Sequence, residues 1–233
     1  MAAPVAARRV LFPLFAFNQE VARAPWVTSE EMIAEMRLQW WRDVLTEIAG
    51  GGPVRRHEVT DPLSEVLDAD GARALDSLIA ARRWDIYRDA FEDAAHFDAY
   101  IDATAGTLLW TAARLLGATD EGVVRDMAYG IGLAAFLQAI PALEAGGRRP
   151  LIDGTPEGVR ALARTGLARL DRGRAGQGAL PPLARAALLT GWDARRLLAL
   201  AAAEPARVAD GALLLSPFRD RTLLAKAALT GRI

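Results

Sequence analysis

The sequence contains no cysteine and only two histidines, His57 and His96. The missing cysteines exclude disulfide bonds, thiolate nucleophiles and zinc sites built on sulfur. Two histidines far apart in the sequence give little basis for an imidazole metal site or a histidine base, and we assign them no role. Any chemistry of this chain therefore rests on carboxylates, arginines, hydroxyl groups and apolar surface.

Long apolar runs and an excess of one charge are also missing. The most apolar stretch, residues 127–143, is broken by glycines and a proline and does not predict a membrane span. Near the N-terminus, Pro13 interrupts the short apolar run that follows Arg8 and Arg9, unlike a secretory signal. Lys and Arg total 28 and Asp and Glu total 29, so a net charge of −1 gives no reason to expect nucleic acid as a partner. We expect a cytoplasmic protein.

Strand patterns are scarce as well. Leu, Ala, Arg and Glu dominate, β-branched runs are few, and apolar residues recur at helical spacing. A chain of 233 residues with 52% hydrophobic content can bury one large core. We therefore predict an all-α fold in a single domain over residues 1–233, without internal repeats.

Caps and chain breakers place the helices. Thr28 or Ser29 followed by two glutamates predicts a helix start, and the glycines before Pro53 predict its end. After a first helix interrupted around Pro25, the predicted helices span about residues 30–48, 62–67, 72–85, 97–116, 121–143, 156–172, 181–203, 205–215 and 217–229. We expect a break at Asp70-Gly71 and a flexible linker over residues 173–178. The small residues of the 121–143 segment predict a central, buried helix.

Four groups of residues, in order along the chain, carry a family resemblance. They are Ala16-Phe17, the run Arg37-Leu38-Gln39-Trp40-Trp41-Arg42-Asp43, Tyr100 with Thr104-Ala105-Gly106-Thr107, and Gly147-Arg148 followed by Leu151. With them the chain resembles the squalene/phytoene synthase family over most of its length, and the run with two tryptophans is the most specific. The resemblance implies an isoprenoid-synthase-type helical bundle, in which the family's enzymes condense two prenyl diphosphates head to head.

This chain lacks the aspartates with which the family's enzymes hold magnesium on two facing helices. The matching positions are Ala22, Trp26, Ala139 and Leu143. None of these side chains can bind a metal, although ionising an allylic diphosphate needs divalent metal held by oxygen ligands. A tryptophan at position 26 would also fill space that metal and diphosphate occupy in the enzymes. We therefore expect no metal site, no cofactor and a chain that is not catalytic, with the old substrate cavity collapsed or repurposed.

A set of arginines and tryptophans is a candidate for anion binding or protein contacts. The set consists of Arg37, Trp40, Trp41, Arg42, Arg148 and Arg149. Tryptophan and arginine dominate interface energetics, but one of the adjacent tryptophans could instead pack in the core. Arginine-rich stretches at residues 160–174 and 195–196 could approach anionic lipid headgroups or form an ordinary solvated face.

A non-catalytic branch of the same family, which includes an assembly factor of respiratory complex I, likewise departs from the aspartate motifs. By analogy, we predict that this chain acts through a protein partner in the assembly of a respiratory complex. Peripheral contact at the inner face of a membrane would be consistent with that role.

Two alternatives stay open. One is an active head-to-head prenyl transferase for hopanoid or carotenoid synthesis, with metal held by Asp85 and Asp89 in a row with Asp93 on one helix face. The row could equally be solvated and paired with nearby arginines. The other alternative is a binder that holds an isoprenoid lipid in an apolar tunnel without reacting it.

Overall fold

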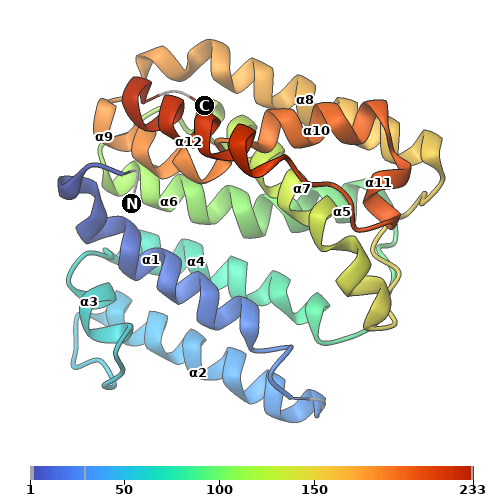
Figure 1. Cartoon of the computed structure of the whole chain (residues 1–233). Coiled ribbons are helices and arrows are strands. Elements are labelled where there is room, and N and C mark those ends of the chain that lie inside the picture. The colour runs from blue at the N-terminus through green and yellow to red at the C-terminus, as the bar shows by residue number, and fades with distance from the viewer. Residues whose placement is uncertain (1–2, 29, 232) are drawn as a thin grey trace.

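The computed structural model describes residues 3–28, 30–231 and 233, and every regular element in these residues is helical (Figure 1). The α-helices are α1 (Val5–Arg23), α2 (Glu31–Gly50), α3 (Thr60–Ser64), α4 (Ala69–Ala81), α5 (Ala94–Ile101), α6 (Thr107–Leu115), α7 (Glu121–Ala145), α8 (Pro156–Gly176), α9 (Pro182–Arg185), α10 (Ala194–Ala203), α11 (Ala206–Ala209) and α12 (Pro217–Thr230). Between some of them lie the 3₁₀ turns η1 (Arg82–Asp85), η3 (Gln177–Ala179) and η4 (Ala186–Gly191) and the π-helical turn η2 (Asp102–Gly106). The predicted all-α class is confirmed.

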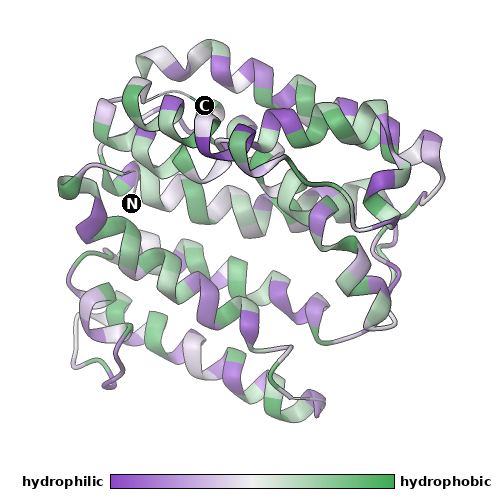
Figure 2. Cartoon of the chain, in the orientation of Figure 1, coloured by the Kyte–Doolittle hydropathy of each residue, from purple (hydrophilic) through white to green (hydrophobic). Residues whose placement is uncertain are grey.

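The helices pack around α7. This helix contacts α8, α10, α6 and the π turn η2, while α2 packs on α4 at the other side of the molecule. In Figure 1, α1, α2 and α4 form the lower part, α6 crosses the middle, and α8, α10 and α12 form the upper part. Figure 2 shows hydrophilic bands on the outer helix α8, while α6 in the middle is mostly hydrophobic. The buried apolar residues form one cluster that extends from α1 to α12, as expected for a single helical domain.

Among the described helices, α7 is long and apolar enough to cross a membrane by length and composition. However, 61% of its most apolar stretch is buried within the protein. Because α7 is enclosed by other helices, its apolar character is accounted for by its place in the core.

Small residues let α7 approach its neighbours closely, as the sequence predicted. A Cβ atom added at Gly130 would lie 2.7 Å from the Cβ of Leu170 on α8. One added at Gly132 would overlap the Cβ of Ala105 in the π turn. Any larger side chain at these positions would force the helices apart.

Two predicted breaks are wrong. Asp68 accepts the backbone N–H of Gly71 at 2.8 Å, so α4 begins at Ala69 and includes Asp70-Gly71. The predicted linker instead continues α8 as far as Gly176. A Cβ at Gly173 would lie 2.8 Å from the backbone nitrogen of Met127, so this glycine serves close packing of α8 on α7 and not a turn.

Three other predicted boundaries also change. The helix predicted over 181–203 is divided, because η4 touches α7 at Gly191 and α10 begins only after Asp193. The segment 205–215 is helical only over α11. At the start of α2 the N-cap residue is Glu30, whose N–H donates to the hydroxyl of Thr28 at 3.1 Å; Ser29 lies outside the described residues.

Candidate functional site

A cavity of about 660 Å³ lies between α1, α7 and the segment that runs from α5 through η2 into α6. The α1 side of its wall consists of Phe15, Asn18, Gln19, Ala22 and, just after the helix, Trp26. The α7 side consists mainly of Gly132, Ala135, Ala139 and Leu143. Both sets follow helical spacing and so lie on one face of each segment. Ala135 and Ala139 are exposed although they belong to the central helix, because they face this open space.

The four positions that the family resemblance assigned to metal-binding aspartates all lie on this wall. Ala22 and Trp26 come from the α1 side, and Ala139 and Leu143 come from α7. Asp85 is the one carboxylate among the described lining residues, and it already accepts two hydrogen bonds. No group of three carboxylate or imidazole side chains in the described ranges could hold a metal ion. The described residues on this wall therefore do not fit a magnesium cluster.

A buried polar network forms one end of the cavity. Asp85 accepts hydrogen bonds from the hydroxyl of Tyr100 at 2.9 Å and from Nη1 of Arg82 at 3.0 Å. Arg82 also donates to the Tyr100 oxygen at 2.9 Å, and Thr104 donates to the backbone carbonyl of Tyr100 at 2.7 Å. The Nε of Arg82 is buried and has no partner among the described residues. This end of the cavity thus presents the Arg82 cation to a polar ligand group, while the hydroxyl groups of Tyr100 and Thr104 already donate within the protein.

The environment fixes the protonation states in this network. Burial raises the pKa of Tyr100, and the neighbouring Asp85 raises it further. Burial by itself lowers the pKa of Arg82, but its attraction to Tyr100 and Asp85 outweighs burial and raises the pKa overall. Tyr100 is therefore a neutral hydrogen-bond donor and Arg82 a permanent cation, so neither is suited to act as a general base near neutral pH.

Trp26 and Arg148 meet at the rim of the cavity. The guanidinium carbon of Arg148 lies 4.4 Å from the centre of the Trp26 ring, and its Nη2 donates to the backbone carbonyl of Asp85. The Trp26 side chain remains about half exposed and lines the cavity without filling it. Of the two predicted alternatives, a collapsed or a repurposed cavity, the collapsed one is therefore wrong. Arg148 is buried in these contacts, whereas its neighbour Arg149 is exposed.

The three aspartates proposed for an alternative metal site, Asp85, Asp89 and Asp93, do not lie on one helix face. The α-helix α4 ends at Ala81, so Asp85 belongs to the 3₁₀ turn η1 and is buried. Asp89 is exposed outside any helix, and Asp93 is the N-cap of α5, where it accepts the N–H of His96 at 2.8 Å. The prediction is wrong because the helix ends before the row begins.

The most specific sequence run, on α2, is divided between the core and the surface. Trp41 is buried against Phe17, with ring centres 5.4 Å apart, and Trp40 is half-buried beside it. Arg42 binds Asp76 of α4 through two hydrogen bonds of 2.7 and 2.9 Å. Arg37 is exposed. These four residues therefore do not form one surface, because three of them hold α2 against the rest of the domain.

An exposed apolar surface near the start of α2 was not predicted from the sequence. Met32 and Met36, one helical turn apart, are 76% and 66% exposed, and Ile33 between them is also exposed. We call these three residues the α2 apolar surface; Arg37 lies next to it in sequence. The signal was present as an i, i+4 pair of methionines, but such a pair is equally typical of a core face.

A helical bundle with an open cavity between α1 and α7, apolar along much of its wall and polar at one end, defines a protein of the isoprenoid-synthase fold class. A sequence profile for squalene/phytoene synthase matches residues 1–151 of the 233, and the chain belongs to this family. The matched part contains every lining residue of the cavity except Thr190.

Two relatives with established names are similar to part of the chain. Both are NADH dehydrogenase (ubiquinone) complex I, assembly factor 6, from Bos taurus at 26% identity and from Homo sapiens at 24% identity, each over 153 residues. The aligned part is 59% of this chain and 43% of each relative. The chain thus matches less than half of the length of these relatives.

Solved structures show the same fold at low identity. A dehydrosqualene synthase in complex with a ligand matches with a TM-score of 0.77 at 15% identity, over 98% of this chain and 88% of that one. The squalene synthase HpnC from Alicyclobacillus acidocaldarius matches with a TM-score of 0.68 at 17% identity, over 86% and 84% of the two chains. At these identities the likeness extends to the fold and not to the activity.

Proposed function

We propose that this chain is a non-catalytic member of the squalene/phytoene synthase family that acts through protein contacts in the assembly of respiratory complex I. The composition of the cavity wall carries the proposal, because the aspartate positions hold Ala22, Trp26, Ala139 and Leu143. Without oxygen ligands there, the charge that develops on a leaving diphosphate is not stabilised by metal. The names of the bovine and human relatives support the choice of complex I.

The α2 apolar surface is the proposed site of the protein contact. Exposed methionines are flexible and adapt to a partner, and clustered apolar side chains on a surface mark interaction sites. Arg37 beside this surface supplies a charged group of the kind that is enriched in interfaces.

Gene deletion in the organism that encodes the chain tests this role. Loss of the protein should lower the amount of assembled complex I on native gels, and the intact chain should restore it. A Met32→Ser/Met36→Ser variant should fold but fail to restore assembly. The matched control is Val5→Ser/Ile152→Ser, which changes two exposed apolar residues on other parts of the surface. Normal complex I in the deletion strain would contradict the assembly role.

A separate assay tests the absence of catalysis. Purified protein is incubated with labelled farnesyl or geranylgeranyl diphosphate, Mg²⁺ and NADPH, and both diphosphate and hydrocarbon product are measured. We expect no release above that of buffer. Turnover of roughly 1 s⁻¹, or within a hundredfold of it, is typical of enzymes and would favour an active prenyl transferase.

The open cavity favours a second candidate function, which is binding of an isoprenoid lipid without reaction. Its volume of about 660 Å³ is in the range of small-molecule sites, and Arg82 and Tyr100 would face the polar end of the ligand. Binding of geranylgeranyl diphosphate can be measured by equilibrium dialysis. An Ala139→Trp variant, which places a large side chain in the open space, should abolish binding while the fold is retained. Binding that survives this change would place the ligand elsewhere.

A further inference from the structure

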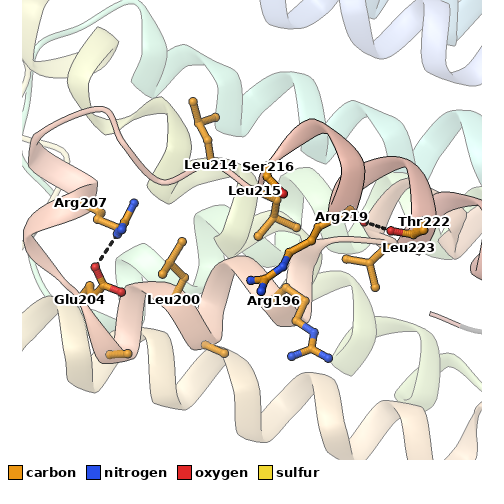
Figure 3. A pocket seen from close by; sticks show the side chains of 12 residues that line it. Arg196, Leu200, Glu204, Arg207, Leu214, Leu215, Ser216, Arg219, Thr222 and Leu223 are labelled. Carbon is orange, nitrogen blue, oxygen red and sulfur yellow. Dashed lines mark hydrogen bonds and ion pairs between the residues drawn. The ribbon is translucent and has the colours of Figure 1, made fainter.

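Two adjoining grooves lie between α10 and α12, away from the cavity. They have volumes of about 850 and 570 Å³ and share the lining residues Arg196 and Leu223. Figure 3 shows the larger one, with leucines of α10 and of the segment before α12 along its walls. We call the two together the α10–α12 groove. It is built from residues beyond 151 and so lies outside the part matched by the family profile.

Positive charge dominates this groove although the whole chain has a net charge of −1. The basic lining residues are Arg174, Arg185, Arg195, Arg196, Arg207, Arg219 and Lys226. Glu204 is the one acidic residue among the described lining residues, and Arg207 already binds it at 2.7 Å. The groove thus has an excess of positive charge, which acidic residues in the rest of the molecule offset in the net charge.

Four of these cations form no ion pair within the described part of the chain. Arg195 binds Asp171 at 2.8 Å, but Arg185, Arg196, Arg219 and Lys226 have no acidic partner. In Figure 3 the side chains of Arg196 and Arg219 extend into the groove from α10 and α12. Burial and the nearby Arg195 lower the pKa of Arg174. Unbalanced like charges on both walls are relieved when an anion binds between them.

The outer side of α12 carries apolar side chains between these cations. Phe218 and Leu229 are 79% and 88% exposed, and the spacing of 218, 222, 225 and 229 places these positions on one face. Arg219 and Lys226, seven residues apart, flank this face on the groove side, and Arg221 flanks it on the other.

The one acidic side chain of α12 points away from the outer face. Asp220 accepts the indole N–H of Trp192 at 2.7 Å and so lies on the side that packs against the protein. The outer face therefore combines exposed apolar groups with positive charge and carries no negative charge. Helices of this composition lie in the interface of anionic membranes, with the apolar face inserted and the basic residues at the headgroups.

We propose that α12 and the α10–α12 groove form a docking face for an anionic phospholipid membrane, with Phe218 and Leu229 entering the bilayer surface and Arg196, Arg219 and Lys226 binding lipid phosphates. The proposal uses none of the cavity residues and does not depend on the function proposed above. It concerns where the protein works and not what it does to a partner.

Sedimentation with vesicles tests this docking face on the intact chain. Vesicles of phosphatidylcholine alone are compared with vesicles in which part of this lipid is replaced by phosphatidylglycerol. We expect strong partitioning to the anionic vesicles, weak partitioning to the neutral ones, and release at high salt. Each basic residue at an anionic surface strengthens partitioning about fivefold, so Arg196→Gln/Arg219→Gln/Lys226→Gln should weaken it roughly hundredfold.

The matched control removes three exposed arginines elsewhere. Arg56→Gln/Arg88→Gln/Arg164→Gln produces the same change in net charge on other surfaces. This variant should partition nearly as the intact chain does. Equal loss in both variants would show that net charge alone attracts the protein, and the proposed face would then be wrong.

Insertion is tested independently at Leu229. The chain has no cysteine, so Leu229→Cys creates a unique position for an environment-sensitive fluorophore. We expect the emission to shift to the blue on anionic vesicles, and an unchanged spectrum would refute insertion. A third result would overturn the proposal. If the intact chain binds polyglutamate but not anionic vesicles, and the triple variant no longer binds polyglutamate, the face binds an acidic protein and not a membrane.

Discussion

Replacement of Asp85 by asparagine tests how strongly the polar network supports the cavity. Asp85 is the carboxylate that accepts hydrogen bonds from both Arg82 and Tyr100, and its side chain is 4% exposed while that of Arg82 is 21% exposed. Removing one partner of a buried ion pair costs about 3–5 kcal/mol. Because Arg82 keeps some contact with water and the amide oxygen can still accept one bond, we expect the lower part of this range, about 3 kcal/mol.

Urea unfolding followed by far-ultraviolet circular dichroism measures this loss. The midpoint should fall while the slope stays the same, which indicates lower stability without a change in the surface exposed on unfolding. For a chain of this size the loss corresponds to a lower Tm by roughly 6–12 °C. Asp89→Asn is the control, because Asp89 is exposed and outside any helix, and its effect should be within about 0.5 kcal/mol. If Asp85→Asn is no more destabilising than Asp89→Asn, the network does not stabilise the fold and our reasoning fails.

Three further predictions concern the helix contacts. Gly173→Ala should lower the free energy of unfolding by about 1–3 kcal/mol despite the better helix propensity of alanine, because the added Cβ meets the backbone of α7. Gly50 is the control, since a Cβ there meets no other atom, and Gly50→Ala should be neutral or stabilising in the same urea assay. Hydrogen bonds from two arginines of α8 lower the pKa of Asp126, so this carboxylate stabilises the fold above its unfolded pKa of about 3.9 and loses that effect as pH falls through the lower folded value. The Tm difference between Asp126→Asn and the intact chain should therefore be present at pH 7 and nearly vanish near pH 2; a difference that persists there would contradict the assignment. Trp41→Ala should cost about 3–5 kcal/mol and Trp40→Ala clearly less, and equal losses would contradict their different burial.

The fold class could be predicted because periodicity and capping residues act locally. The central helix, for example, follows from a stretch of small and apolar residues that no other secondary structure accommodates as well. The errors at Gly71 and Gly173 have a different cause. Gly173 lies in a helix because the backbone of α7 leaves no room for a Cβ, and that constraint comes from residues distant in sequence. Gly71 lies in the first turn of α4, which Asp68 caps, and a Cβ there would meet the side chain of Leu67.

The site was predictable only in part for the same reason. The resemblance assigns Ala22, Trp26, Ala139 and Leu143 to aspartate positions from the sequence alone, and the structure brings these four residues to one cavity. The role of Arg82 could not be identified, because its position beside Tyr100 depends on the 3₁₀ turn that ends α4. The sequence also could not predict that the cavity is open, since this depends on the contact that holds Trp26 against Arg148 at the rim.

The docking face on α12 has an unusual chemical consequence. Of the 28 basic residues, Lys226 is the one lysine, and all others are arginines. Guanidinium groups do not lose their proton at any pH at which proteins normally work. A change in membrane affinity with pH would therefore come from carboxylates or from the lipid headgroups. Enzymatic acetylation, which neutralises lysine and leaves arginine unchanged, could remove charge from this face at a single position.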